Sequence, residues 1–114
     1  MLTIYKICEE TEWRGGADAG QFGGSAIDHA DGFIHFSTAV QLAETAAKHF
    51  AGRSGLVLIA VDAQALGSGL KWERSRGGDL FPHLYGALPL GAVLWARPLP
   101  DEAGGRRAIL ELPP

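Results

Sequence analysis

The segment Leu56–Val61 constrains the fold more than any other part of the chain, because it is an almost uninterrupted apolar run. A strand that is exposed on one face alternates between apolar and polar residues, whereas this segment does not. Such a run is typical of a central strand that is buried on both faces. The sequence therefore predicts a sheet with this strand in its interior.

The second element with clear signals is a helix over residues 38–51. Thr38 and Gln41 have the spacing of a capping box, which marks a helix start. Gly52 is a plausible end signal. Apolar residues recur along one face with helical spacing, at Ala43, Ala46, Ala47 and Phe50. We expect that face to pack on a sheet.

The rest of the chain is predicted to be rich in strands. A helical turn is expected at residues 9–13, a glycine-rich loop from there to residue 30, a short helical turn at 62–66, a polar loop at 74–79 and turns at 98–107. Further strands are expected at residues 2–8, 32–37, 70–73, 92–97 and 108–112. The predicted class is α+β, with one main helix, in a single domain over residues 1–114.

Composition limits the classes of function. The chain has 114 residues, of which 46% are hydrophobic and 20% charged, as in ordinary globular domains. It has no apolar run that could span a bilayer, and from its first residues we expect no secretion signal. A lone cysteine, Cys8, fits a reducing compartment, so we expect a cytoplasmic location without membrane contact. The net charge of −3, with no basic cluster beyond Arg106-Arg107, argues against binding to a nucleic-acid duplex.

The segment 32–38 combines a core face with a polar face. Strand periodicity places Ile34 and Phe36 on one side and Phe33, His35 and Ser37 on the other. A helix is expected to begin directly afterwards, and free N–H groups at a helix start favour anions such as phosphate. His35 is therefore a candidate ligand-binding residue. The alternative is a half-buried histidine that only bonds to the backbone.

Two later segments supply further polar groups. Glu73 ends a short predicted strand in which Trp72 is expected to be core, and it could bind a sugar hydroxyl or act as a base. Its alternative is a surface carboxylate paired with a neighbouring arginine. In residues 81–86, Phe81, His83 and Tyr85 share a side if the segment is extended, which suits a planar ring or a ribose. The alternative there is a packed corner around Pro82 and Gly86.

Metal binding and cysteine chemistry are not expected. The spacing from His29 to His35 matches no zinc pattern, although His35, Glu73 and His83 could in principle form a facial site. Cys8 has no local signature of a nucleophile and is expected in the core.

Three segments together resemble a bacterial family known as domain of unknown function 952: Gly-Phe-Ile-His-Phe-Ser-Thr at 32–38, Lys-Trp-Glu at 71–73 and Phe-Pro-His-Leu-Tyr-Gly at 81–86. The resemblance runs from Ile4-Tyr5-Lys6-Ile7 through Trp13 to the strand around Val93. That family is grouped by fold with the ADP-ribosyltransferases, whose split sheet binds NAD in a central cleft. The resemblance therefore implies a small ADP-ribosyltransferase-like split β-sheet with its main helix at residues 38–51.

The resemblance also implies roles for individual residues. Glu73 would steady a sugar cation and, with His35, form the catalytic pair, since cleavage of a glycosidic bond develops oxocarbenium character. The expected substrate-binding residues are Ser37, Thr38, Phe81, His83 and Tyr85. The resemblance makes NAD a candidate substrate rather than a bound cofactor, and no metal is expected. Lys71 replaces the first carboxylate of the Glu-x-Glu pair in arginine-modifying members, which argues against arginine modification.

Several readings of function stay open at this level. The first is an enzyme that binds or cleaves NAD, ADP-ribose or a related nucleotide or ribosyl ligand, with transferase or NAD glycohydrolase-like activity. The second is a non-catalytic module that binds a small metabolite in the same cleft. The third is a pocket used only for packing or for formation of a homodimer.

Overall fold

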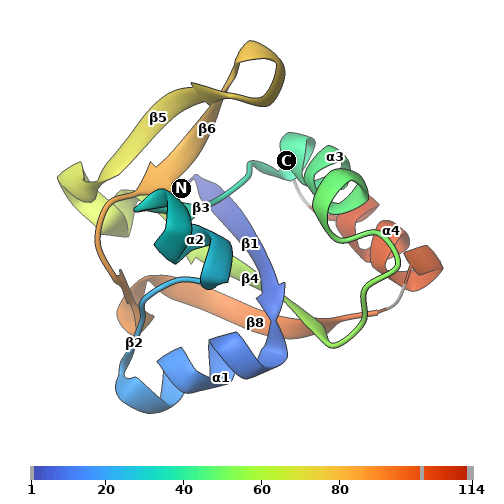
Figure 1. The fold of residues 1–114 in the computed structure, drawn as a ribbon, viewed down its shortest axis with the longest axis horizontal. Helices are drawn as coiled ribbons and strands as arrows, with labels where there is room; N and C mark the ends of the chain where they lie inside the picture. The colour runs from blue at the N-terminus through green and yellow to red at the C-terminus, as the bar shows by residue number, and fades with distance from the viewer. Residues whose placement is uncertain (1, 101, 113–114) are drawn as a thin grey trace.

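The computed structural model describes residues 2–100 and 102–112 as an α+β fold (Figure 1). Its strands are β1 (Thr3–Glu9), β2 (Gln21–Phe22), β3 (Ile34–His35), β4 (Leu56–Asp62), β5 (Leu70–Ser75), β6 (Asp79–Leu84), β7 (Leu88–Pro89) and β8 (Val93–Leu99). Its α-helices are α1 (Glu10–Ala19), α2 (Ala26–Asp31), α3 (Ala39–His49) and α4 (Glu102–Leu110). Short 3₁₀ helices cover Ala63–Gly69, Arg76–Gly78 and Leu90–Ala92.

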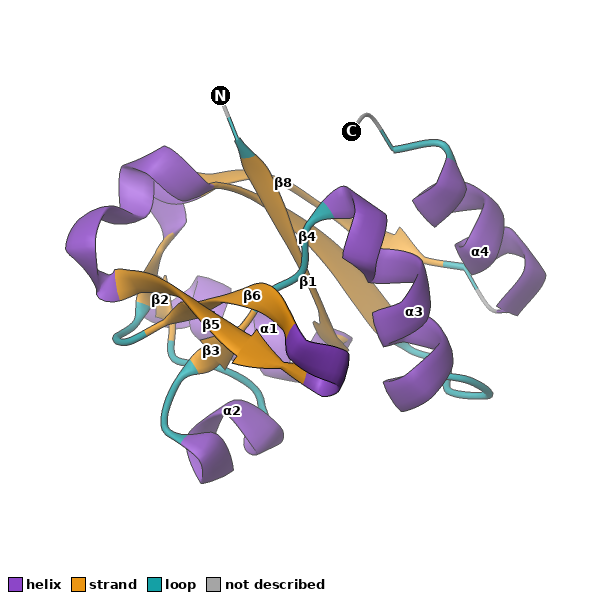
Figure 2. Ribbon diagram, turned by 90° about the horizontal axis from the view of Figure 1, so that it is seen from above, coloured by secondary structure: helices purple, strands orange, loops and turns teal. Residues whose placement is uncertain are grey.

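The strands pair in antiparallel sheets with the orders β1-β4-β8, β3-β6-β5 and β2-β7. The first two sheets meet where Tyr5 and Ser37 exchange two backbone hydrogen bonds of 2.8 Å. Figure 2 shows α3 and α4 side by side on one side of the β1-β4-β8 sheet, and the β5–β6 hairpin reaches α3, where Gln41 Nε2 donates to the Leu80 backbone oxygen at 2.7 Å. The chain thus brings two sheets together along β1 and the segment after β3.

Strand β4 is buried on both faces, as the sequence predicts. Val57, Ile59 and Val61 join one core cluster, with side chains from β3, β6 and β7. Leu56, Leu58 and Ala60 join the other, with residues of α3 and α4. Both the odd-numbered and the even-numbered residues of β4 must therefore be apolar, which explains the unbroken apolar run.

Helix α3 begins as predicted. The Thr38 hydroxyl accepts a hydrogen bond from the Gln41 N–H at 3.2 Å, and the Gln41 side chain accepts one from the Thr38 N–H at 3.0 Å. Leu42 is buried against the β1-β4-β8 sheet, while Ala46 and Phe50 pack at the edge of the same cluster. The helix itself ends at His49.

The predicted strand at 108–112 is wrong, because residues 102–110 form helix α4. Ile109 is buried whereas Leu110 is 70% exposed, so this short apolar run presents only one side to the core. Gly104 and Gly105 made a helix unexpected. A side chain at position 105 would lie 2.5 Å from the Pro100 carbonyl oxygen, which explains the glycine there.

The prediction of a glycine-rich loop up to residue 30 is also wrong over much of its length. Helix α1 continues through Gly15 and Gly16, and α2 fills residues 26–31, so the chain has more than one main helix. A Cβ at position 16 would come within 2.8 Å of the Phe22 backbone, so this glycine permits close packing. Trp72, expected in the core, is 40% exposed on β5. Among the residues described, no helix is both long and apolar enough to cross a membrane.

The central strand gives a direct test of this packing. We expect Ile59→Ala to lower the free energy of unfolding by about 2–5 kcal/mol, because Ile59 is fully buried and its truncation leaves a cavity. Val40→Ala on α3, where the side chain is 85% exposed, should change it by less than about 0.5 kcal/mol. Urea denaturation measures both, and equal effects would contradict the placement of β4.

Candidate functional site

A buried ionic cluster lies where β1, α2 and β3 meet. The parity of β1 puts Lys6 on the same face as Ile4 and Cys8, inside the core, and its side chain is only 4% exposed. Its ammonium lies 2.8 Å from Asp28 Oδ2 and donates to the backbone oxygen of His35 at 3.0 Å. A charge removed from water in this way needs an opposite charge and hydrogen bonds, and Asp28 on α2 supplies the charge.

Asp28 is the centre of this cluster. Its Oδ2 also accepts the Ser25 N–H at 2.8 Å, and its Oδ1 lies 3.1 Å from the His35 backbone nitrogen and 2.6 Å from His35 Nδ1. Burial would raise the pKa of Asp28, but the hydrogen bond from His35 and the adjacent Lys6 charge outweigh it and hold the pKa well below its ordinary value. Asp28 is therefore ionised and tied to three separate segments.

His35 lies between two carboxylates. Its Nδ1 faces Asp28, and its Nε2 lies 2.9 Å from Asp31 Oδ2. Both contacts are hydrogen bonds at once only when the ring carries both protons, because an ionised carboxylate only accepts. The buried Asp28 carboxylate orients the ring, and the ring is 23% exposed, so part of it reaches the surface.

A second cluster lies on the β5–β6 hairpin. Lys71 pairs directly with His83 across the two strands, which leaves Glu73 diagonal to His83 on the same face. Glu73 Oε1 accepts from His83 Nδ1 and from the Tyr85 hydroxyl, each at 2.8 Å. His83 is 4% exposed, and its Nε2 has no hydrogen-bond partner among the residues described.

The hydrogen bonds fix the ionisation of this second cluster. The bond from His83, and next the bond from Tyr85, lower the pKa of Glu73. The bond to Glu73 raises the pKa of Tyr85, since ionisation would place a phenolate beside a carboxylate. At neutral pH Glu73 is therefore a carboxylate, which suits stabilisation of a nearby positive charge and does not suit proton donation.

Phe33 connects the two clusters. Its ring stacks on His83 with a centroid separation of 4.1 Å and lies 4.5 Å from His35 and 5.3 Å from Tyr85. The rings of His35 and His83 are themselves 5.6 Å apart. The ionic cluster and the Glu73 cluster therefore form one continuous surface.

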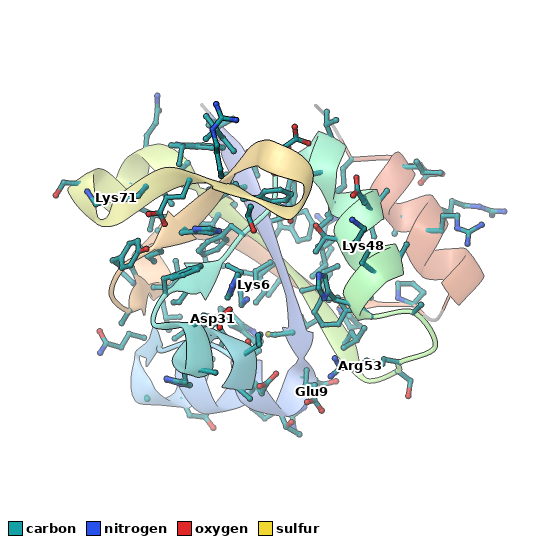
Figure 3. All side chains as sticks on the ribbon, turned by 45° about the horizontal axis from the view of Figure 1, so that its top comes forward. Lys6, Glu9, Asp31, Lys48, Arg53 and Lys71 are labelled. Carbon is teal, nitrogen blue, oxygen red and sulfur yellow. The ribbon has the colours of Figure 1, made fainter. Side chains whose placement is uncertain are left out.

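A cleft of about 490 Å³ opens beside this surface, between β1, α2 and α3. Four of its lining residues are labelled in Figure 3, where Lys6 and Asp31 lie near each other and Glu9 and Arg53 lie near each other. Its polar lining comes from Lys6, Glu9, Glu12, Ser25, Asp31, His35, Ser37, Thr45, His49, Arg53 and Ser75. Ser75 and Glu73 are two residues apart on β5, so Glu73 projects from the same face of the sheet.

The structure brings some of the predicted site residues together and separates others. His35 and Ser37 line the cleft, and Glu73, His83 and Tyr85 form the adjoining cluster. Ser37 is 2% exposed and bonds to the Thr45 hydroxyl at 2.9 Å. Thr38 and Phe81 belong to neither group, since Thr38 caps α3 and Phe81 is buried at 5% exposure.

Sequence reasoning missed Lys6, Asp28, Asp31 and Phe33. Lys6 lies between Ile4 and Cys8 on a face of β1 that is otherwise apolar, and a lysine in such a position is a signal of a buried charge. Ser25 and Asp28 have capping-box spacing, which could have placed α2.

Burial raises the pKa of Cys8 to about 12, so this thiol is not a nucleophile at neutral pH. In the described part of the chain, no three histidine, cysteine or acidic side chains converge to hold a metal ion.

Comparison with known proteins identifies the family. Residues 7–96 match the family described as "Protein of unknown function (DUF952)". The chain belongs to this family. The crystal structure of protein CC0527 from Caulobacter crescentus, a structural-genomics target, is 51% identical over 90% of each chain, with a TM-score of 0.85. The solution NMR structure of CC0527 is 51% identical over 92% of this chain and 90% of that one, with a TM-score of 0.80.

No match was found among the curated proteins. The DUF952 fold is thus supported by two kinds of structure determination on a close relative, while the names of these relatives state no activity. The function has to be argued from the site.

The ionic cluster predicts a large effect at Asp28. We expect Asp28→Asn to lower the free energy of unfolding by about 3–5 kcal/mol, because Lys6 keeps a buried charge without its partner. Adding Lys6→Met should recover part of this loss. Asp18→Asn, at an exposed position of α1, is the control and should stay within about 0.5 kcal/mol. A loss below about 1 kcal/mol for Asp28→Asn would contradict the cluster.

The same carboxylate predicts how stability depends on pH. Because the folded-state pKa of Asp28 is depressed, its contribution is complete above the ordinary value of 3.8 and is lost as the pH falls below it. Denaturation of the wild type and of Asp28→Asn at pH 7 and at pH 3 should therefore show the difference between them shrinking in acid. A difference that is unchanged or larger at pH 3 would show that Asp28 is not stabilised as a carboxylate.

The Glu73 cluster makes a spectroscopic prediction. Glu73→Gln should lower the pKa of Tyr85 toward its ordinary value of 10.0, because the neighbouring negative charge is gone. The pKa of Tyr5, which burial raises, should not change. Absorbance of tyrosinate during alkaline titration measures both residues. Identical titration curves for the wild type and the variant would contradict the Tyr85–Glu73 hydrogen bond.

Proposed function

We propose that this DUF952 protein binds a small ribosyl ligand in the cleft against His35, and that Glu73 stabilises positive charge on the ribose as its N-glycosidic bond is cleaved. The observation that carries the proposal is the continuity of the His35 and Glu73 clusters through Phe33. NAD, ADP-ribose and related ribosides are the candidate ligands. An ADP-ribosyltransferase-like relationship of the fold is part of this proposal.

The chemistry follows from the ionisation of the groups. When the bond from ribose C1′ to the base nitrogen breaks, the base leaves with the electron pair, and C1′ and the ring oxygen share a positive charge. An ionised carboxylate that is already oriented by two donors stabilises this charge without reorganising. Water then adds to C1′ and gives up a proton, which goes to the base when the base leaves as an anion and to the solvent when it leaves as a neutral ring. The products are the free base and the free sugar, which is ribose from a nucleoside and ADP-ribose from NAD.

The surroundings of Glu73 suit this role. Tyr85 is 44% exposed and Phe33 is half-buried, so two aromatic rings are available beside the carboxylate. His83 orients Glu73 from within the hairpin, and the stacking of Phe33 on His83 keeps that imidazole in place. The base of a riboside can contact these rings while its sugar faces His35.

Loss of the Glu73 charge tests the catalytic part. In Glu73→Gln we expect turnover of a ribosyl substrate to fall by about 10²–10³, as for removal of one transition-state-stabilising group, with ligand binding retained. Thermal shift reports binding, because a ligand at about a hundred times its dissociation constant adds roughly 2.7 kcal/mol. Release of the free base, measured by chromatography, reports turnover.

The controls separate folding from chemistry. Glu111→Gln, an exposed carboxylate outside the cleft lining, should retain both binding and turnover. Normal turnover in Glu73→Gln would remove the assigned role of Glu73. Absence of any shift with NAD, ADP-ribose or nucleosides in the wild type would remove the proposed function.

A second candidate is a binding module without catalysis. It is favoured by one observation: Glu73, His83 and Tyr85 adjoin the cleft but are not among the residues that line it. Under this alternative the wild type shows a thermal shift and forms no product. The shift is lost in His35→Ala and kept in His29→Ala, where the replaced histidine is exposed on α2.

A further inference from the structure

The cleft carries more negative than positive charge. Glu9, Glu12 and Asp31 line it, and Asp28 lies directly behind Lys6, so four carboxylates lie at the cleft. In the described part of the chain, the basic side chains of the lining are Lys6 and Arg53, together with the imidazoles of His35 and His49, and even with the His35 ring doubly protonated the carboxylates outnumber Lys6, Arg53 and His35. Both cations are already close to carboxylates, since Lys6 lies 2.8 Å from Asp28 and Arg53 lies 3.4 Å from Glu9. The field inside such a cleft repels an anion and attracts a cation.

Two of the backbone donors at the start of α2 that could bind a phosphate are also occupied. The Ala26 N–H donates to Glu12 Oε2 and the Ser25 N–H donates to Asp28 Oδ2, each at 2.8 Å. A helix start normally attracts anions, but here two of the protein's own carboxylates fill that position. At the start of α3, the Thr38 and Gln41 N–H groups are taken by the capping box.

The same carboxylates suit a sugar diol. The Asp31 side chain is 45% exposed, and His35 Nε2 lies 2.9 Å from its Oδ2. An oriented, ionised carboxylate accepts hydrogen bonds from ribose hydroxyls, and acidic side chains commonly hold this part of a nucleotide. The cleft therefore supplies acceptors for ribose while it offers little to a phosphate.

We propose that the ligand of this cleft is an N-riboside without phosphate, that is, a nucleoside with a neutral or cationic base, and that Asp31 binds its ribose hydroxyls. The inference rests on the proposed function and narrows its substrate class. A pyridinium riboside fits especially well, because the positive ring is attracted to the carboxylates and to the aromatic side chains. NAD, nucleotides and ADP-ribose bind less well, since each carries phosphate into a cleft of excess negative charge.

The test compares matched pairs that differ only by a 5′-phosphate. Isothermal titration calorimetry is run on the wild type with nicotinamide riboside and its mononucleotide, with adenosine and its monophosphate, and with NAD. We expect each riboside to bind at least about fivefold more tightly than its 5′-phosphate at low ionic strength. Raising the salt concentration should narrow the difference within each pair.

Variants test whether the preference for ribosides over their 5′-phosphates arises in the cleft. Asp31→Asn should weaken the binding of nicotinamide riboside by about tenfold, through loss of a charge and a diol acceptor, and should weaken its mononucleotide less. Asp18→Asn, on α1 outside the cleft lining, is the matched control and should leave both affinities unchanged. Melting curves confirm that each variant is folded.

The outcomes are distinct. Equal or tighter binding of the phosphorylated member of each pair, or of NAD, overturns this inference and leaves the proposed function standing. Unchanged affinity of the riboside in Asp31→Asn overturns the role of Asp31. If no riboside, nucleotide or NAD binds, the proposed function fails and this inference fails with it.

Discussion

The arrangement of the cleft depends on the interaction of Asp28 with Lys6 and His35. A lysine at an inward position of β1 is tolerated only because a carboxylate from α2 reaches it inside the core. The same carboxylate receives the backbone and ring nitrogens of His35, so it fixes where β3 lies relative to β1. One buried anion therefore joins three segments that are distant in sequence, and the cleft opens beside this junction.

The two polar clusters orient different side chains of the proposed site. The Asp28 cluster orients His35 and Asp31 at the cleft, whereas the β5–β6 hairpin orients Glu73 through His83 and Tyr85. Strand pairing positions the second cluster, and the ionic contacts position the first. Phe33 packs between them, and its ring contacts a histidine of each cluster.

Elements with strong local signals could be predicted from the sequence. The apolar run at β4, the capping box at Thr38 and the alternation around His35 each reflect a short-range rule, and each holds in the structure. The proximity of Glu73, His83 and Tyr85 also follows from strand geometry once the hairpin is formed. Whether these residues act together on a ligand is the part that stays a prediction.

The missed features have tertiary causes. Gly16 and Gly105 read as helix breakers, yet they lie in helices because close packing against Phe22 and Pro100 requires a residue without a side chain. The pairing of Lys6 with Asp28 spans 22 positions in the sequence and carries no local pattern. The exposure of Trp72 has a tertiary cause as well. Whether a tryptophan on β5 is buried depends on what the rest of the chain packs against its side of the strand, and the local sequence does not show this.

The central claim is that a ligand binds in the cleft against His35. The chain has four histidines, at positions 29, 35, 49 and 83, and their imidazole nitrogen resonances in an NMR spectrum report on separate places. On titration with nicotinamide riboside, the account predicts shifts of the His35 and His49 resonances, which line the cleft, with little change at His29 on the exposed side of α2. Saturable shifts at His29 alone, or none at His35, would contradict it.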